Sequence, residues 1–189
     1  IGPYGDDVYS ALLSAKEAGL VAKIGVSVYN PSQLLAVLER FDLDVVQAPA
    51  NLLDNRFQKS AVFSLGKGLT VERHIRSVFL QGLLLMDSVN RPNKFLPWKK
   101  LWFCLDKLIN DLGYSRQELC LRYMVSKYPD DTFVVGVDNL GQVREIFNLM
   151  LQGRLPEDEF IHVQNEVWRI CEQCPNISQL INPFEWSQE

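Results

Sequence analysis

Polar side chains stand at the ends of four short apolar segments, where they could bind and orient a small molecule. These residues are Ser27, Gln47, Asn51, Arg76, Ser77, Asp138 and Asn139. In an eight-stranded β/α barrel, groups at the carboxyl ends of the strands form the active face. The positions therefore indicate hydrogen-bonding chemistry at one face of an α/β fold.

Cys171 and Cys174 have the Cys-x-x-Cys spacing that zinc sites use. A structural zinc site needs two further ligands, and the sequence has neither a second such pair nor a paired histidine. We therefore interpret both residues as free thiols on a helix and expect no metal. With Cys104 and Cys120 they fit a reduced, cytoplasmic protein better than a disulfide scaffold.

The phosphate-binding motifs of nucleotide folds do not occur in the sequence. Gly-x-Gly-x-x-Gly is absent, and the segment Gly66-Lys67-Gly68 is a poor phosphate loop. Gly68 stands where the magnesium-binding hydroxyl belongs, and Ala61 stands where the upstream glycine belongs. A doubly wound nucleotide-binding fold is therefore not favoured.

Strand and helix patterns alternate along the chain. Apolar, β-branched runs predict strands at 24–29, 44–48, 74–79 and 132–137. Helices are expected at 6–18, from Pro31 through Leu38, at about 58–65, at 101–112, from Ser115 onward, after Asn139, and at about 156–171. Asn30, Ser115 and Asn139 are the expected helix caps. Residues 87–97 should form a long loop.

Four strands, each followed by a helix, predict a parallel sheet with right-handed crossovers. Four such units are half of an eight-stranded barrel, and 189 residues fall short of the roughly 250 of a whole one. Because the chain starts with Ile1, we expect it to be a fragment whose upstream part is not represented. We expect a single domain over 1–189, with barrel units to about 150 and a C-terminal helix and tail at 151–189.

Composition excludes several classes of protein. With 47% hydrophobic and 22% charged residues the chain is too apolar to be disordered. A formal charge of -4 without a lysine or arginine block argues against nucleic-acid binding. No apolar run reaches the roughly 18 residues of a membrane-spanning helix, so neither nucleic acid nor membrane is an expected partner.

Several ordered motifs together resemble the aldo-keto reductase superfamily. They are Lys23-Ile24-Gly25-Val26-Ser27, Val46-Gln47 leading to Asn51-Leu52-Leu53-Asp54, Arg76 to Leu84, Glu118 to Tyr123, and Val135-Gly136-Val137 to Gln142 and Glu145. In that family these segments are strands five to eight of a (β/α)8 TIM barrel. The resemblance implies that this chain supplies roughly the C-terminal half.

The resemblance also implies a cofactor site, since the family reduces carbonyls with NADPH. Ser27 and Gln47 match residues that hydrogen-bond the nicotinamide carboxamide, and Arg76 falls where many members place an aromatic ring. The remaining implied residues are Ser77, Phe79 and Gln81 near the pyrophosphate, and Gly136, Asn139, Gln142 and Glu145 near the adenosine and 2'-phosphate. Gln142 stands where basic residues often pair that phosphate, so NADP is expected and NAD is the alternative cofactor.

Each assignment has a structural alternative. Ser27 and Gln47 could be ordinary polar strand ends, and Arg76 could form an ion pair with a carboxylate. Asn51 and Asp54 are interpreted as structural residues that hold a turn. Trp98, Trp102 and Phe103 are expected to pack in the core or a loop, with a substrate-pocket wall as the alternative.

The catalytic Asp, Tyr, Lys and His of the family belong to the first half of the barrel, so none is assigned here. His74 is expected to open the third strand at the inactive end, and His162 lies on the late helix. The leading hypothesis is an NAD(P)-dependent oxidoreductase whose chain is inactive alone. The alternatives are a non-catalytic half-barrel that binds a nucleotide or partner, and a pseudo-enzyme with a regulatory role.

An isolated half-barrel would expose two strand edges and an apolar interior. We therefore expect the chain to associate with the missing N-terminal half, to pair with a second copy of itself, or to be poorly soluble. The expected substrate is a small carbonyl compound or alcohol.

Overall fold

The computed structural model describes residues 2–59 and 71–187. Its residues group into two compact units. The first, the sheet unit, comprises Ile1–Ala50, Asn55–Arg76 and Asp131–Val134. The second, the helical unit, comprises Asn51–Asp54, Ser77–Asp130 and Val135–Glu189. Each is described by itself.

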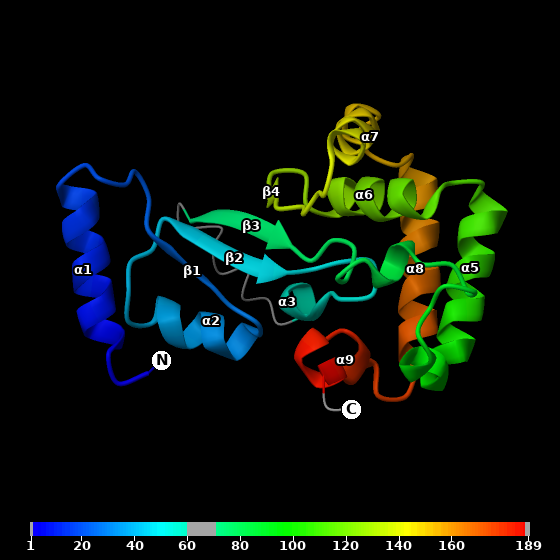
Figure 1. Ribbon diagram of the computed structural model, residues 1–189, viewed down its shortest axis with the longest axis horizontal. Helices are drawn as coiled ribbons and strands as arrows, with labels where there is room; N and C mark the ends of the chain where they lie inside the picture. Colours follow the sequence, from blue (N-terminus) through cyan, green and yellow to red (C-terminus); the bar gives the residue numbers. More distant parts are fainter. Residues whose placement is uncertain (1, 60–70, 188–189) are drawn as a thin grey trace. The chain divides into compact units, whose positions relative to one another are not determined.

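The sheet unit contains a four-stranded parallel sheet with the order β1-β2-β3-β4 (Figure 1). Its elements are α1 (Gly5–Glu17), β1 (Gly25–Ser27), α2 (Pro31–Leu38), β2 (Val45–Pro49), α3 (Arg56–Lys59), β3 (Glu72–Arg76) and β4 (Thr132–Phe133). Strands that are neighbours in sequence are neighbours in the sheet, as repeated β/α units require. The expected parallel α/β architecture is confirmed.

The strands are shorter than the sequence predicted. β3 begins at Glu72 and ends at Arg76, rather than spanning 74–79, because Ser77 has a positive φ of 62° that turns the chain out of the sheet. β4 is limited to Thr132–Phe133, although the Val134 amide still donates to the Ile75 carbonyl. The helix predicted at 58–65 starts earlier, as α3, and residues 60–65 lie outside the described residues, as does Gly66-Lys67-Gly68.

Helix ends in the sheet unit follow local rules. The Asn30 side chain accepts a hydrogen bond from the Gln33 amide, and Pro31 takes the first helical position of α2. α1 ends before Gly19, whose φ of 73° lets the last turn close. The helix predicted at 6–18 is confirmed within one residue at each end, and the helix predicted after Asn30 begins at Pro31 as expected.

The buried side of the sheet is apolar. Val46, Ala48 and Ile75 alternate along β2 and β3 with more exposed residues and are almost fully buried. Leu34 of α2 and Phe57 of α3 are also buried. This period-two alternation leaves the opposite face for polar side chains.

The helical unit consists mainly of four longer helices. Its elements are η2 (Leu83–Leu85), η3 (Asn93–Trp98), α5 (Lys99–Leu112), α6 (Arg116–Lys127), α7 (Leu140–Leu151), α8 (Glu157–Glu172), α9 (Ile177–Leu180) and η4 (Pro183–Ser187). α5 packs on α8, and α6 packs on α7. η3 occupies part of the stretch 87–97 that was expected to be a loop.

Buried stripes at helical spacing explain why α5 and α8 pair (Figure 1). Leu101, Leu105 and Leu108 of α5 are buried, as the sequence predicted, and Val163, Val167 and Ile170 of α8 face inward as well. Gly113 ends α5 with a φ of 74°, and Ser115 caps α6 by accepting from the Glu118 amide. Within the described residues, no helix has the length and apolarity needed to cross a bilayer.

Candidate functional site

The register of the sheet places the predicted site residues of the sheet unit on one face. Ser27 is paired with Gln47, and Gln47 with His74. Pro49 is paired with Arg76, two residues further along both strands. Side chains paired across parallel strands share a face, and alternate residues return to it, so Ser27, Gln47 and Arg76 all face away from the buried side.

Ser27 and Gln47 are in direct contact. The Ser27 hydroxyl donates to Gln47 Oε1 at 3.2 Å. Because this hydrogen bond uses the amide oxygen, it orients the Gln47 NH₂ group as a donor. Ser27 is exposed and Gln47 is half-buried, so the pair can reach a ligand at the carboxyl end of the sheet.

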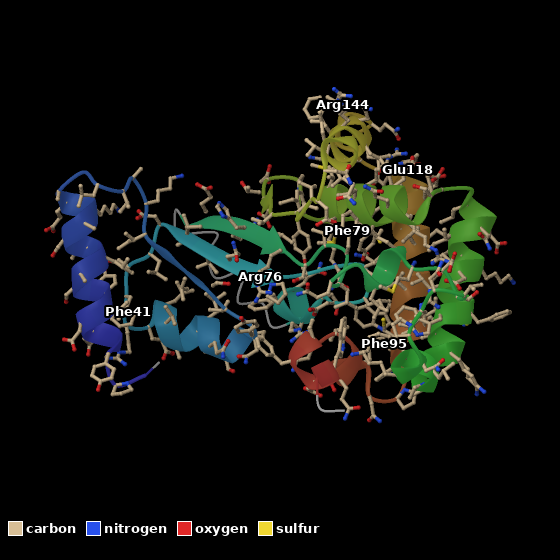
Figure 2. All side chains as sticks on the ribbon, viewed as in Figure 1. Phe41, Arg76, Phe79, Phe95, Glu118 and Arg144 are labelled. Carbon is tan, nitrogen blue, oxygen red and sulfur yellow. The ribbon has the colours of Figure 1, made fainter. Side chains whose placement is uncertain are left out.

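Arg76 at the end of β3 lies against the end of β1 (Figure 2). Its guanidinium carbon is 4.6 Å from the centre of the Tyr29 ring. Its Nη2 also donates to the Val28 carbonyl at 3.2 Å. The planar guanidinium is thus held over an aromatic ring, an arrangement that gives a cation–π attraction.

Arg56 is a second cation at this edge that sequence reasoning missed. Its Nη1 donates to the Tyr29 carbonyl at 3.3 Å. Arg56 begins α3, the helix that follows β2. The pattern of apolar residues in the sequence does not predict that its side chain reaches Tyr29. We call Ser27, Tyr29, Gln47, Arg56 and Arg76 the carboxyl edge.

His74 does not lie where the sequence suggested. Because β3 starts at Glu72, His74 stands in the middle of the strand rather than at its opening. Its Nε2 is 2.7 Å from the Glu72 carboxylate, which also pairs with Lys23. These two partners, Lys23 foremost, hold the pKa of Glu72 below its usual range. The spacing Glu72-x-His74-x-Arg76 is the signal that would have placed all three on one face.

In the helical unit, Ser77, Phe79 and Gln81 belong to a tight turn after β3. Ser77, Leu80 and Gln81 have φ values of 62°, 48° and 55°, and Gly82 follows at 82°. A positive φ is uncommon in non-glycine residues and costs energy. The buried side chains of Val78 and Leu80 anchor the turn.

Asn139 and Gln142 have a structural role at the start of α7. The Asn139 side chain accepts from the Gln142 amide at 3.0 Å, and Gln142 Oε1 accepts from the Asp138 amide at 2.8 Å. Asn30 and Gln33 make the same reciprocal cap at α2. Gly136 lies in the segment before this cap, and Glu145 is exposed on the helix. Their assignment to a cofactor site stays a prediction.

The predicted cofactor residues thus divide between the two units. Ser27, Gln47 and Arg76 belong to the sheet unit and converge on one face. The others, Ser77, Phe79, Gln81, Gly136, Asn139, Gln142 and Glu145, belong to the helical unit.

A tyrosine–lysine pair does occur, but its chemistry does not suit a proton donor. Lys127 Nζ donates to the Tyr123 hydroxyl oxygen at 3.3 Å within α6. Burial raises the pKa of Tyr123 to about 12, whereas a general acid for a carbonyl needs a lowered pKa. Tyr123 is therefore a core residue, packed on the Phe160 ring at 5.5 Å.

Of the residues predicted to be structural, Asn51 and Trp102 are buried and Phe103 is not. Asn51 is buried, and its Oδ1 accepts from the amides of Leu53 and Asp54, so its turn-forming role is confirmed. Trp102 is buried and donates to the Phe95 carbonyl. Phe103 is 70% exposed, so the expectation that it packs in the core is wrong.

The four cysteines are free thiols. Cys171 Sγ lies 3.8 Å from the Leu53 carbonyl, and Cys174 Sγ lies 3.7 Å from the Pro175 carbonyl. Over residues 2–59 and 71–187, no group of three histidine, cysteine or acidic side chains could hold a metal ion.

Comparisons with known proteins identify relatives of the chain. The Aldo/keto reductase family model matches residues 4–166. A search of curated proteins found no match. Among solved structures, an aldo-keto reductase from Bacillus halodurans in its apo form has a TM-score of 0.65 at 19% identity, over 89% of this chain and 57% of that one.

Two further solved structures are similar. The glycerol dehydrogenase from Gluconobacter oxydans has a TM-score of 0.65 at 21% identity, over 84% of this chain and 52% of that one. The aldose reductase from Schistosoma japonicum has a TM-score of 0.61 at 15% identity, over 88% of this chain and 48% of that one. The chain therefore has the fold of part of these proteins and spans about half of their length.

Proposed function

The chain belongs to the aldo/keto reductase family, and we propose that it carries the cofactor-binding part of an NAD(P)-dependent oxidoreductase. The reaction would transfer a hydride between the cofactor and a small carbonyl compound or alcohol. The arrangement that supports this proposal best is the carboxyl edge, where Ser27, Gln47 and Arg76 share one face of the sheet.

The side chains of the carboxyl edge fit a nicotinamide dinucleotide. The Gln47 NH₂ group is a donor for the carboxamide oxygen, and the Ser27 oxygen is an acceptor for the carboxamide nitrogen. Two rigid strands hold this pair, so the amide could bind in only one orientation, and hence one ring face would be presented. When bound, the cofactor supplies the hydride.

Arg76 would influence which redox state of the cofactor binds. The oxidised nicotinamide ring is positively charged, and a guanidinium nearby disfavours it relative to the neutral reduced ring. The Tyr29 ring and the Val28 carbonyl, which accepts a hydrogen bond from Arg76, hold that guanidinium in place. We therefore expect tighter binding of the reduced cofactor.

The proton donor would come from outside the described residues. Tyr123 and Lys127, the tyrosine–lysine pair described above, have the wrong acidity, because the pKa of Tyr123 is raised. We propose that the N-terminal half of the barrel contributes the catalytic groups. The coverage of about half of each matched structure supports this division.

The sheet unit offers an edge for that missing half. β1 pairs with β2 on one side, and no other described strand pairs with it. Beside it lies an apolar groove of about 360 Å³, lined by Val8 and Leu12 of α1, Val26 of β1 and Phe41. No residue of α1 is buried, and Val8 is 57% exposed. A parallel strand added to β1 would pair its free backbone groups and cover this groove.

The proposal is tested by titrating the chain with NADPH, alone and mixed with a separately produced N-terminal half-barrel of a family member. Gln47→Ala should weaken NADPH binding by about tenfold, the loss expected for one hydrogen bond of about 1.4 kcal/mol. Gln152→Ala, at the exposed C-terminal end of α7, is the matched control and should leave the affinity unchanged.

The outcomes separate the candidate functions. Carbonyl reduction by the mixture, lost when either half is omitted, would support the oxidoreductase. NADPH binding without any reduction by the mixture would favour a non-catalytic barrel. If the mixture does not bind NADPH, or if Gln47→Ala binds as tightly as the parent chain, the carboxyl edge is not a cofactor site.

A further inference from the structure

A cavity of about 850 Å³ lies in the helical unit between the start of α5 and the end of α8. Its size is in the range of sites that hold small ligands. None of the residues assigned to the cofactor lines it. Its walls combine aromatic rings, aliphatic side chains, two lysines and two thiols.

The lysines of this cavity carry uncompensated charge. Lys99 and Lys100 both line it, and neither side chain has an ion pair or hydrogen bond with the part of the chain that the structure describes. By comparison, two arginines of the same unit are paired: Arg122 contacts Glu118 at 3.0 Å, and Arg116 contacts Asp106 at 2.8 Å. Two adjacent cations without a counter-charge favour an anion.

The Trp98 indole contributes a ring to the cavity wall. Its Nε1 is buried and has no partner among the described residues. By contrast, the indoles of Trp102 and Trp186 donate to the carbonyls of Phe95 and Leu180 at 3.1 and 3.0 Å. Because this nitrogen is buried, a ligand in the cavity would contact the Trp98 ring and not its N–H.

Phe103 contributes an exposed aromatic ring to the same cavity. The side chain is 70% exposed and is one of the residues of α5 that line the cavity. This ring shares the cavity wall with Trp98 and the two lysines and provides a surface on which another ring can stack.

We propose that this cavity binds an anionic aromatic small molecule, with the carboxylate or sulfonate near Lys99 and Lys100 and the rings against Trp98 and Phe103. The binding site is separate from the proposed cofactor site, so the two proposals can fail independently. Cys104 and Cys174, which also line the cavity, are reporters of its occupancy.

The first test is protection of these thiols from alkylation. The chain is treated with iodoacetamide in alkaline buffer, because burial raises the pKa of Cys174, and each cysteine is followed by mass spectrometry. The probe is 8-anilinonaphthalene-1-sulfonate, and the uncharged N-phenyl-1-naphthylamine is its control. At nine times its dissociation constant the sulfonate should slow alkylation of Cys104 and Cys174 about tenfold, as expected for a site nine-tenths occupied.

Cys171 is the internal control. It belongs to α8 but does not line the cavity, and its thiol lies against the Leu53 carbonyl. Its alkylation rate should not change with the sulfonate. Equal protection of Cys171, or binding of the sulfonate without protection of Cys104 and Cys174, would overturn the proposed location. Equal protection by the uncharged probe would overturn the anionic class of ligand.

The second test removes the charges. The double variant Lys99→Gln with Lys100→Gln should bind the sulfonate at least about tenfold more weakly. Lys107→Gln, on the same helix but outside the cavity, should bind as the parent chain does. An unchanged affinity of the double variant would overturn the proposal.

Discussion

The Arg76 guanidinium lies 4.6 Å from the centre of the Tyr29 ring and donates to the neighbouring Val28 carbonyl at 3.2 Å. These two contacts join the end of β3 to the end of β1, across the intervening strand β2. Arg56 also donates to the backbone carbonyl of Tyr29, so two cations of the carboxyl edge contact the same residue, Arg76 at its ring and Arg56 at its carbonyl.

Arg76→Met should change the redox preference of cofactor binding. Loss of the cation should reduce the ratio of the dissociation constants for the oxidised and the reduced cofactor about threefold to tenfold. The reason is that the guanidinium repels the positively charged oxidised ring, and this repulsion is only partly screened at the protein surface. The ratio of the two dissociation constants, measured by titration, checks this. Arg40→Met is the control, because Arg40 also lies over a ring, that of Phe41 at 5.2 Å, but not at the carboxyl edge. An unchanged ratio in Arg76→Met would contradict the role of Arg76.

Gly25→Ala should destabilise the sheet. A Cβ at Gly25 would overlap the backbone carbonyl of Val45, its partner in β2. Because a backbone atom must move, we expect a loss of about 2 kcal/mol in the free energy of unfolding, measured by urea denaturation. Gly136→Ala has open space around the new atom and should stay within about 0.5 kcal/mol of the parent. Equal stability of the two variants would refute the close approach.

Asn51→Ala should unfold more readily because it removes an acceptor from a buried turn. Asn51 is 1% exposed, and its Oδ1 accepts from the amides of Leu53 and Asp54 at 3.0 and 3.1 Å. The Asp54 amide also donates to the Asn51 backbone carbonyl at 3.1 Å, which the variant keeps. Loss of the side-chain acceptor of the Leu53 amide should cost about 2 kcal/mol in the free energy of unfolding. The exposed Asn165 of α8 supplies the control, and Asn165→Ala should be nearly neutral in the same urea titration.

Asp44→Asn should reduce the acid sensitivity of the chain. Its carboxylate accepts from Lys16 Nζ at 2.7 Å and from the Ile24 amide at 2.9 Å, and these contacts, Lys16 foremost, hold the pKa of Asp44 below its usual range. A pKa lowered by folding adds stability above the unfolded value of about 4, and this contribution disappears as the pH falls through the folded value.

Thermal unfolding measured at pH 7 and near pH 2 checks this prediction. The difference in melting temperature between parent and Asp44→Asn should be clear at pH 7 and should shrink near pH 2. Asp42→Asn, which keeps the backbone carbonyl that accepts from Tyr9, serves as the control. A difference of the same size at both pH values would show that Asp44 acts without its charge.

Much of the fold could be predicted because the signals are local. Asn30, Ser115 and Asn139 cap helices through hydrogen bonds that reach only three residues, and leucines at helical spacing mark the buried side of α5. The ends of the strands were less predictable. β3 stops at Arg76 because Ser77 adopts a positive φ, a conformation that the apolar run of the sequence does not signal.

The sequence by itself determined the order of strands and helices, the caps, and the residues that resemble a cofactor site, since each depends on spacing between near neighbours. Only the tertiary structure decided that Ser27, Gln47 and Arg76 share a face, that Arg56 reaches Tyr29, and that Phe103 lines a cavity with Lys99 and Cys174. These relationships join residues from different elements. They depend on strand register and helix packing, which arise from many weak contacts across the whole core rather than from any local pattern.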